Sequence, residues 1–250
     1  MPHNGARGMP IVLSIGTSHP WNVAGVGRDV VVGTDLGARV FTAIAAVSAQ
    51  DGRGVVALHC VPNDVFEAQL AVLPWDSAGA VRVGALPTPI AVRSVATALT
   101  SHPWLPAVVD PAFSASRSGE LVGVAARYGV RDDLAALPNV VLTPNLDEAA
   151  LLLGKPSIGR DEIAEAAAAL RARGSLAVLL KGGHLNGDPT DALATAAGVE
   201  MFSDPRIAGR MHGTGCTLAM VLACELARGT ALIAAVRAAR AYVRDQIARH

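Results

Sequence analysis

Two glycines flank a threonine in the segment His212-Gly213-Thr214-Gly215-Cys216, which leads into an apolar stretch. Glycines allow consecutive backbone N–H groups to turn toward one point, and the start of a helix favours negative charge there. We therefore expect this turn to bind an anion such as a phosphoryl group in transfer. A glycine-rich helix cap beside an inert buried cysteine would explain the same pattern.

Cys216 stands at the predicted start of the helix. The helix dipole is expected to lower the pKa of its thiol below the free value of about 8.5. A thiolate at this point could accept a proton from a substrate hydroxyl. The turn would then be catalytic, and the chain a small-molecule kinase.

A second candidate segment is Thr143-Pro144-Asn145-Leu146-Asp147-Glu148. Asn145 can cap the helix that follows Pro144, and Glu148 has the spacing of a capping box. The same two side chains could instead lie near Mg²⁺ and phosphates, because Mg²⁺ prefers hard oxygen ligands. The pattern alone leaves both interpretations open.

A third segment, Leu180-Lys181-Gly182-Gly183-His184, places a lysine at the end of an apolar run. Lysine is seldom buried without a partner, and a phosphate would supply one. The glycines would let a nucleotide approach the backbone. An exposed turn with a solvated lysine is the alternative.

Two single residues are weaker candidates. Asp110 ends the run Val108-Val109-Asp110-Pro111, where it could serve a site or cap the next loop. Gln50 is expected between a helix and a strand, and its amide could pair with adjacent N and NH₂ groups of a heteroaromatic ring. A surface glutamine is the simpler interpretation of Gln50.

Alternating apolar runs and helical stretches must position these residues. The predicted strands are 11–15, 55–60, 80–83, 107–110, 140–143 and 177–180, with a late hairpin over 192–196 and 200–203. The predicted helices are 61–73, 89–100, 146–153, 161–173, 214–227 and 230–248, the last capped by Thr230. This order predicts a three-layer α/β/α sandwich with a mostly parallel central sheet. Its ligand crevice should lie beyond the carboxyl ends of the strands.

Composition narrows the class of protein. Of the 250 residues, 51% are hydrophobic and 17% charged, and 21 basic residues balance 21 acidic ones. We predict one domain over residues 11–250 after a disordered leader over 1–10, with no nucleic-acid or membrane partner. Three widely spaced cysteines indicate reduced thiols and a cytoplasmic protein.

Taken in order, the segments resemble the hydroxymethylpyrimidine/phosphomethylpyrimidine kinases of thiamine biosynthesis, which are ribokinase-like. The resemblance runs over nearly the whole chain, through Ser14-Ile15-Gly16-Thr17, AQDGRGV (49–55), VVDP (108–111), TPNLDEA (143–149), LKGGH (180–184) and HGTGCTLA (212–219). It implies transfer of the ATP γ-phosphoryl group, with Mg²⁺, to the hydroxymethyl group of a pyrimidine or to its monophosphate. It also implies a homodimer.

The resemblance implies a role for each candidate residue. Cys216 would be the catalytic base, and the amides of Gly213, Thr214 and Gly215 would form the anion hole. The nucleotide would lie near Lys181, Asn145, Asp110 and Gly183, with Glu148 toward Mg²⁺. The substrate would meet Gln50, Gly16, Asp29 and Phe113.

Departures from the family pattern fall on the substrate side. The usual G-x-D-P-S-G-G-A-G loop is one residue longer here over 16–25 and lacks the Asp-Pro-Ser, and K-x-G-M-L becomes Arg82-Val83-Gly84-Ala85-Leu86. Phe113 could replace the lost methionine by stacking on the ring. A reshaped pocket is the favoured explanation. It leaves open a pyridoxal-type vitamin kinase or a catalytically impaired pyrimidine-binding paralogue.

Overall fold

The computed structural model describes residues 8–51, 53–114, 121–183, 187–209 and 211–249. Nine strands form one sheet in the order β3-β2-β1-β4-β5-β6-β7-β8-β9. In chain order the strands are β1 (Ile11–Ser18), β2 (Arg39–Gln50), β3 (Val55–Cys60), β4 (Ala80–Val83), β5 (Ala107–Val109), β6 (Val140–Leu142), β7 (Ala177–Leu180), β8 (Thr190–Thr195) and β9 (Gly198–Ser203).

The central strands of the sheet are parallel and the two ends are antiparallel. β2, β1, β4, β5, β6 and β7 pair in parallel, β3 folds back on β2, and β8 and β9 form an antiparallel end beside β7. Parallel neighbours need long crossovers, which here contain helices. The predicted α/β/α architecture with a mostly parallel sheet is confirmed.

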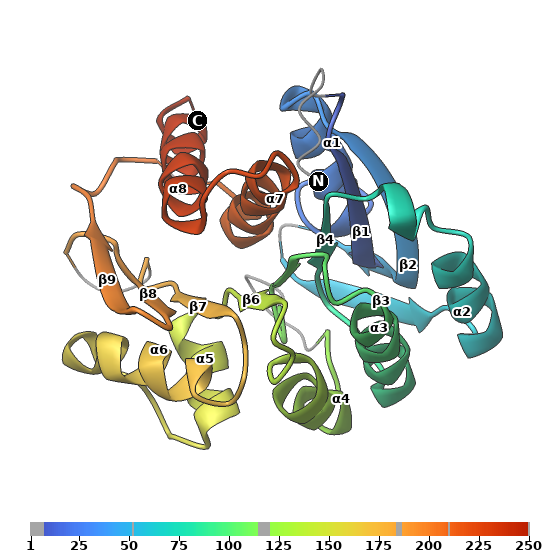
Figure 1. The fold of residues 1–250 in the computed structure, drawn as a ribbon, viewed down its shortest axis with the longest axis horizontal. Coiled ribbons are helices and arrows are strands. Elements are labelled where there is room, and N and C mark those ends of the chain that lie inside the picture. The colour runs from blue at the N-terminus through green and yellow to red at the C-terminus, as the bar shows by residue number, and fades with distance from the viewer. Residues whose placement is uncertain (1–7, 52, 115–120, 184–186, 210, 250) are drawn as a thin grey trace.

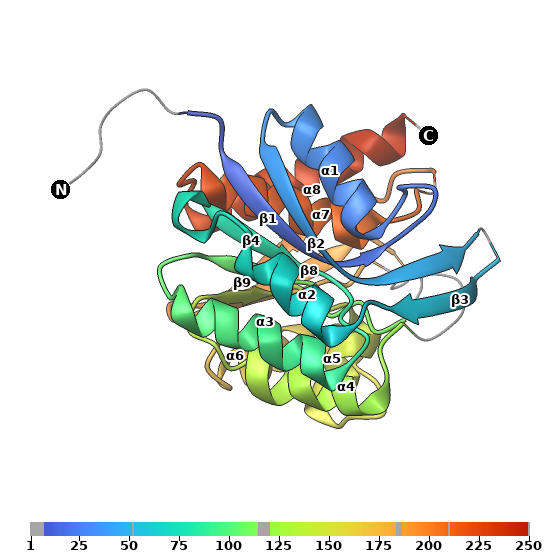
Figure 2. The same ribbon diagram turned by 90° about the vertical axis from the view of Figure 1, so that its right-hand side faces the viewer.

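Helices cover both faces of the sheet (Figure 1). On one face lie α1 (Gly25–Asp35), α7 (Thr214–Ala227) and α8 (Leu232–Ala248). On the other lie α2 (Asn63–Ala71), α3 (Pro89–Ser101), α4 (Val124–Gly129), α5 (Leu146–Leu153) and α6 (Ile163–Arg171). Single helical turns occupy Trp75–Ser77, Val130–Leu134 and Arg160–Glu162. Figure 2 shows the β2–β3 hairpin projecting beyond these layers.

Several predicted elements need correction. Strands β3, β4 and β7 and helices α5 and α7 have the predicted bounds, but β2, α1 and α4 were not predicted. The β2 sequence, RVFTAIAAVSAQ, is rich in alanine, so its composition favours a helix although its burial alternates in part. Gln50 therefore ends a strand and does not follow a helix.

The two chain ends also differ from expectation. β1 begins at Ile11 as predicted but continues to Ser18, past the predicted end at Ile15. α8 begins after Ala231, which lacks a side-chain cap, while Thr230 Oγ1 donates to Glu225 Oε2 at 2.9 Å. Residues 1–7 of the predicted leader lie outside the described residues. Within the described ranges, no helix is both long and apolar enough to cross a bilayer.

Each face of the sheet packs against its own apolar core. Alternate strand residues such as Leu13 and Val81 belong to the larger core, under α2–α6. Their neighbours Val12 and Ala80 belong to the second core, against α7 and α8. This alternation, which follows from the strand period of two, decides which polar residues at the strand ends can face α7.

Candidate active site

Five polar residues, which we call the polar ladder, come from neighbouring parallel strands: four lie at or next to the carboxyl ends of their strands, and Ser14 lies within β1. Each comes two residues after a core residue packed on the α7 side of the sheet: Ser14 after Val12, Arg82 after Ala80, Asp110 after Val108, Thr143 after Val141 and Lys181 after Leu179. Because strand side chains alternate, all five point toward α1 and the start of α7.

Asp110 is the centre of the polar ladder. Its Oδ1 lies 2.7 Å from Lys181 Nζ, and its Oδ2 lies 3.4 Å from Arg82 Nη2. Burial alone would raise the pKa of Asp110, but Lys181 and Arg82 hold it below its ordinary value. Burial would likewise lower the pKa of Lys181, which Asp110 and Glu148 instead raise. The lysine thus stays charged although its side chain is only 15% exposed.

The first turn of α7 lies directly against this ion pair. Gly213, in the left-handed region at φ 77°, is the N-cap, and α7 begins at Thr214. A Cβ at Gly215 would lie 3.2 Å from Lys181 Nζ and 3.7 Å from Asp110 Oδ2. The first N–H groups of a helix have no partner within it. Together with Lys181 they form a cradle suited to an anion.

Cys216 lies partly exposed in the same turn. The Arg82 guanidinium and the Gly25 backbone N–H both favour the charged form of its thiol. Burial raises the pKa of Cys216, while Arg82 acts in the opposite direction. The expectation that the helix start lowers this pKa is therefore wrong for the free protein, because desolvation outweighs the favourable charges.

Asp29 lies beneath this turn and is fully buried. Its Oδ2 accepts a 2.7 Å hydrogen bond from Ser14 Oγ and lies 3.4 Å from Arg82 Nε. Burial raises the pKa of Asp29 to about 6, with Arg82 and Ser14 opposing. The carboxylate is enclosed by protein groups, although its Oδ1 accepts no hydrogen bond from the described residues, and direct substrate contact at Asp29 stays a prediction.

The altered loop over 17–24 packs on the Gly213 turn at the start of α7. A Cβ at Gly213 would lie 1.9 Å from the Val23 carbonyl oxygen, so only glycine permits this approach. The buried His19 ring lies 5.8 Å from the His212 ring, and its Nδ1 accepts from the Trp21 N–H at 3.1 Å. Burial, followed by His212, lowers the pKa of His19. The rewritten loop is therefore part of the site wall.

Asn145 and Glu148 form the predicted capping box of α5. Asn145 Oδ1 accepts from the Glu148 N–H at 2.9 Å, and Glu148 Oε2 accepts from the Asn145 N–H at 2.8 Å. The backbones of Asn145 and Lys181 also form an isolated parallel β-bridge, just past the ends of β6 and β7. Burial raises the pKa of Glu148, and Asp110 raises it further against the effect of Lys181. The capping interpretation is confirmed, and the box carries a buried carboxyl toward the Lys181–Asp110 pair.

The remaining substrate-side residues divide into two groups. Gln50 Nε2 donates to Ser48 Oγ at 2.8 Å, and Ser48 donates in turn to the Ser18 carbonyl at the end of β1. A Cβ at Gly16 would lie 3.4 Å from Gly84 Cα, which packs β1 closely on the segment after β4. Gln50 and Gly16 therefore lie at the same edge of the sheet as the polar ladder.

Phe113 belongs to the second group, because its side chain is only 1% exposed. It lines a cavity of about 220 Å³ with Arg127 and Tyr128 near α4 and Leu152 of α5. In the structure the ring packs in the core under α4 and α5, and stacking of Phe113 on a substrate stays a prediction.

Gly183 comes two residues after Lys181, on the predicted nucleotide side of the site. It is exposed, and its carbonyl accepts from Arg206 Nη2 at 3.2 Å. The preceding Gly182 N–H donates to Asp191 Oδ1 at 2.9 Å, which fixes the start of this turn. His184 lies outside the described residues.

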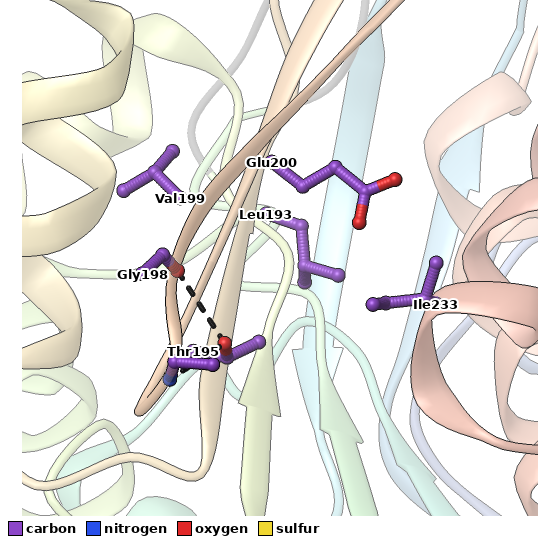
Figure 3. Close-up of a pocket in the computed structure, with 7 residues that line it drawn as sticks. Leu193, Thr195, Gly198, Val199, Glu200 and Ile233 are labelled. Carbon is purple, nitrogen blue, oxygen red and sulfur yellow. Dashed lines mark hydrogen bonds between the residues drawn. The ribbon is translucent and has the colours of Figure 1, made fainter.

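A separate cavity of about 150 Å³ lies far from these residues (Figure 3). Leu193 and Gly198 of the β8–β9 hairpin and Ile233 of α8 line it. β8 runs antiparallel to β7, so its Thr195 end lies at the amino-terminal edge of the sheet. The cavity is thus at the opposite end of the strands from Lys181.

The sequence reasoning missed three residues of the site. Arg82 and Ser14 belong to the polar ladder, and Arg28 Nε on α1 donates to Thr217 Oγ1 of α7 at 3.0 Å. A charged residue inside the short apolar strand Ala80–Val83 was the available signal for Arg82. No comparable signal marks Arg28, because α1 itself was not predicted.

The chain is similar to known small-molecule kinases in sequence and in fold. The phosphomethylpyrimidine kinase family model matches residues 20–250. The chain is similar to a hydroxymethylpyrimidine/phosphomethylpyrimidine kinase of Streptomyces coelicolor, with 37% identity covering 95% of this chain and 88% of the relative. A Rhizobium meliloti kinase of the same name is 36% identical, covering 95% and 90%. The structure of an ADP complex of Bacillus subtilis pyridoxal kinase has 26% identity and a TM-score of 0.87, covering 96% of this chain and 92% of that one.

The contact between Gly213 and Val23 predicts a difference between two glycines. Gly213 and Gly229 both have φ 77°, but a Cβ at Gly229 would meet nothing within 4 Å. We expect Gly229→Ala to lower the free energy of unfolding by about 1 kcal/mol, the cost of the left-handed backbone. Gly213→Ala should cost about 3 kcal/mol or more, since the loop must also move. Urea unfolding measures both, and equal losses would contradict the close packing of the loop.

Proposed function

This chain belongs to the phosphomethylpyrimidine kinase family, and from that premise we propose that it phosphorylates 4-amino-5-hydroxymethyl-2-methylpyrimidine, its monophosphate, or both, with ATP. The reaction belongs to thiamine biosynthesis. The observation that carries the proposal is the Lys181–Asp110 ion pair against Gly215 in the first turn of α7. The turn provides backbone donors, and the ion pair holds the Lys181 ammonium beside them, as phosphoryl transfer requires.

The proposed nucleotide site uses the residues around this ion pair. Lys181 would bind the phosphates, with Asn145 beside it and the Gly183 turn at the edge of the site. The amides of Gly213, Thr214 and Gly215 would stabilise the charge that develops on the transferred group. Asp110 would hold the Lys181 ammonium in place.

Mg²⁺ fits the carboxyl group of Glu148. Burial raises the pKa of this group and Asp110 raises it further, against the effect of Lys181, so a divalent cation would favour the charged carboxylate. No group of three or more side chains able to hold a metal occurs among the described residues. Mg²⁺ with ATP needs only one or two carboxylates besides phosphates and water. When bound, the ion would neutralise charge on the phosphates.

Cys216 is proposed as the base. As the substrate oxygen forms its bond to the γ-phosphorus, the bond from that phosphorus to the β–γ bridging oxygen breaks and ADP leaves. The hydroxyl proton passes to Cys216 Sγ. Arg82 and the Gly25 N–H favour the charged form of this sulfur.

The acceptor would bind at the carboxyl end of β1, beside Gly16 and Gln50. The Gln50 amide is held there by Ser48 and can pair with a ring nitrogen and an amino group. A pyridoxal-type kinase remains the second candidate, supported by the likeness to the Bacillus subtilis pyridoxal kinase. The rewritten loop over 17–24 would decide between the two rings.

A turnover assay tests the proposed activity. Purified protein with Mg·ATP and either pyrimidine should yield ADP and the corresponding phosphorylated pyrimidine. Absence of product above background would refute the activity, and calorimetric binding of the pyrimidine without turnover would identify an impaired paralogue. Competition with pyridoxal measures the preference: a larger kcat/KM for pyridoxal would make it the substrate.

Replacing Cys216 tests its role. Cys216→Ala should lower kcat on the order of 10²-fold, because the proton would lose its acceptor. Cys224→Ala is the matched control: this thiol is buried farther along α7, and burial raises its pKa to about 12. A near-wild-type rate for Cys216→Ala would leave Cys216 a structural role only.

We also propose a cytoplasmic homodimer. The β2–β3 hairpin exposes Val47 and Val56, at 52% and 77%, on an edge of the sheet that a second chain could cover. Sedimentation equilibrium should give twice the chain mass of 25.5 kDa. Val56→Lys should shift the mass toward the monomer. A monomer mass for the unaltered protein at micromolar concentration would exclude the homodimer.

A further inference from the structure

A buried ion pair joins the last helix of the chain to the sheet, on the nucleotide side of the site. Arg240 of α8 is paired with Asp191 of β8, and both side chains are only 8% exposed. A second carboxylate, Asp204 just past β9, lies 2.6 Å from Arg240 Nη2. The guanidinium also lies over the Phe202 ring, 5.7 Å from its centroid. Removing one partner of such a pair leaves an uncompensated buried charge, so the two side chains hold each other in place.

The other oxygen of Asp191 reaches the turn that follows Lys181. Asp191 Oδ1 accepts a 2.9 Å hydrogen bond from the Gly182 N–H, while its Oδ2 is the atom paired with Arg240. A Cβ at Gly182 would lie 2.1 Å from the Thr190 carbonyl oxygen, so this backbone packs directly on the start of β8. Gly182 has no side chain with which to anchor the turn. A carboxylate on the neighbouring strand therefore fixes it instead.

Helix α8 reaches the same turn by a second route. Arg244, one helical turn after Arg240, donates from Nη1 to the Pro205 carbonyl at 2.8 Å. Arg206, the residue after Pro205, donates from Nη2 to the Gly183 carbonyl at 3.2 Å. α8 also shares an apolar core with α7, whose first turn is the other wall of the proposed phosphate site. The last helix therefore supports both walls.

We propose that Asp191 and Arg240 are positioning residues that hold the turn after Lys181 in the conformation that receives the nucleotide phosphates. Asp191 acts through the Gly182 N–H, and Arg240 acts through Asp191. This inference rests on the proposed function for its catalytic meaning, but nucleotide binding can be measured without an acceptor or any turnover. The ligand affected is the nucleoside di- or triphosphate, because the acceptor would bind on the other side of the site, beside Gln50.

Calorimetric binding of Mg·ADP tests the proposal. Asp191→Ala removes the acceptor of the Gly182 N–H and should raise Kd about tenfold, as expected for the loss of a hydrogen bond to a charged group. Asp191→Asn breaks the ion pair but keeps a side-chain oxygen that can accept from Gly182, so its Kd should lie closer to that of wild type. Arg240→Met leaves Asp191 in place without its buried partner and should weaken binding by a smaller factor than Asp191→Ala.

Two substitutions in α8 separate positioning from stability. Val236→Ala truncates a fully buried core residue of the same helix and should lower the midpoint of urea unfolding without changing Kd. Arg237→Gln removes an exposed arginine, paired with Glu200 at 2.8 Å, and should change neither quantity.

A double variant serves if Asp191→Ala does not fold. Asp191→Leu combined with Arg240→Met replaces both buried charges by apolar side chains, a change that buried ion pairs commonly tolerate. The Gly182 N–H again has no carboxylate to bind, so Kd should rise by the same factor as expected for Asp191→Ala.

The outcomes separate the two claims. In an active kinase, Asp191→Ala should raise KM for ATP, while KM for the pyrimidine stays within about twofold. A loss of Mg·ADP affinity in a protein that phosphorylates neither pyrimidine would support the positioning role and refute the proposed function. A Kd within about twofold of wild type in folded Asp191→Ala, or an equal loss of affinity in Val236→Ala, would overturn the positioning role. Absence of both Mg·ADP binding and product formation in the unaltered protein would overturn both.

Discussion

The arrangement of the site depends on charges buried under the start of α7. Lys181 and Arg82 would be costly to bury alone, and so would Asp110 and Asp29. Each is tolerable because the others lie within hydrogen-bond or ion-pair reach, at 2.7–3.4 Å. These residues come from α1 and from the ends of three strands, so the charges can pair only when the sheet and α1 are correctly assembled. The pairing of these buried charges thus constrains both the stability of the fold and the geometry of the site.

The two sides of the site are held by different kinds of contact. The nucleotide side is held by short contacts among strand ends, α5 and α7, and its segments keep the family pattern. The substrate side is closed by the loop over 17–24, which contacts α7 through Gly213 and through the His19–His212 pair. The loop is therefore held against α7 although its own residues depart from the family pattern. Under the proposed function, a change in this loop could alter the choice of acceptor while the contacts among the strand ends stay in place.

Much of this fold could be predicted from the sequence, because buried parallel strands are short apolar runs and helix ends carry recognisable caps. The capping box of Asn145 and Glu148 and the bounds of α7 are examples. β2 was missed because its alanines favour a helix, and only pairing with β1 makes it a strand. The burial of Phe113 and Asp29 was not predicted for a related reason: residue type alone does not show which side of a loop or helix the packing encloses.

The pKa of Cys216 illustrates how the buried charges and the chemistry meet. A helix start and an arginine would together give a very stable thiolate, which is a weak base. Burial and two nearby carboxylates push the pKa the other way. A general base works best when its pKa lies near the ambient pH, so opposing influences suit it better than a single strong one. The carboxylates that hold Arg82 in place therefore also moderate its effect on the sulfur.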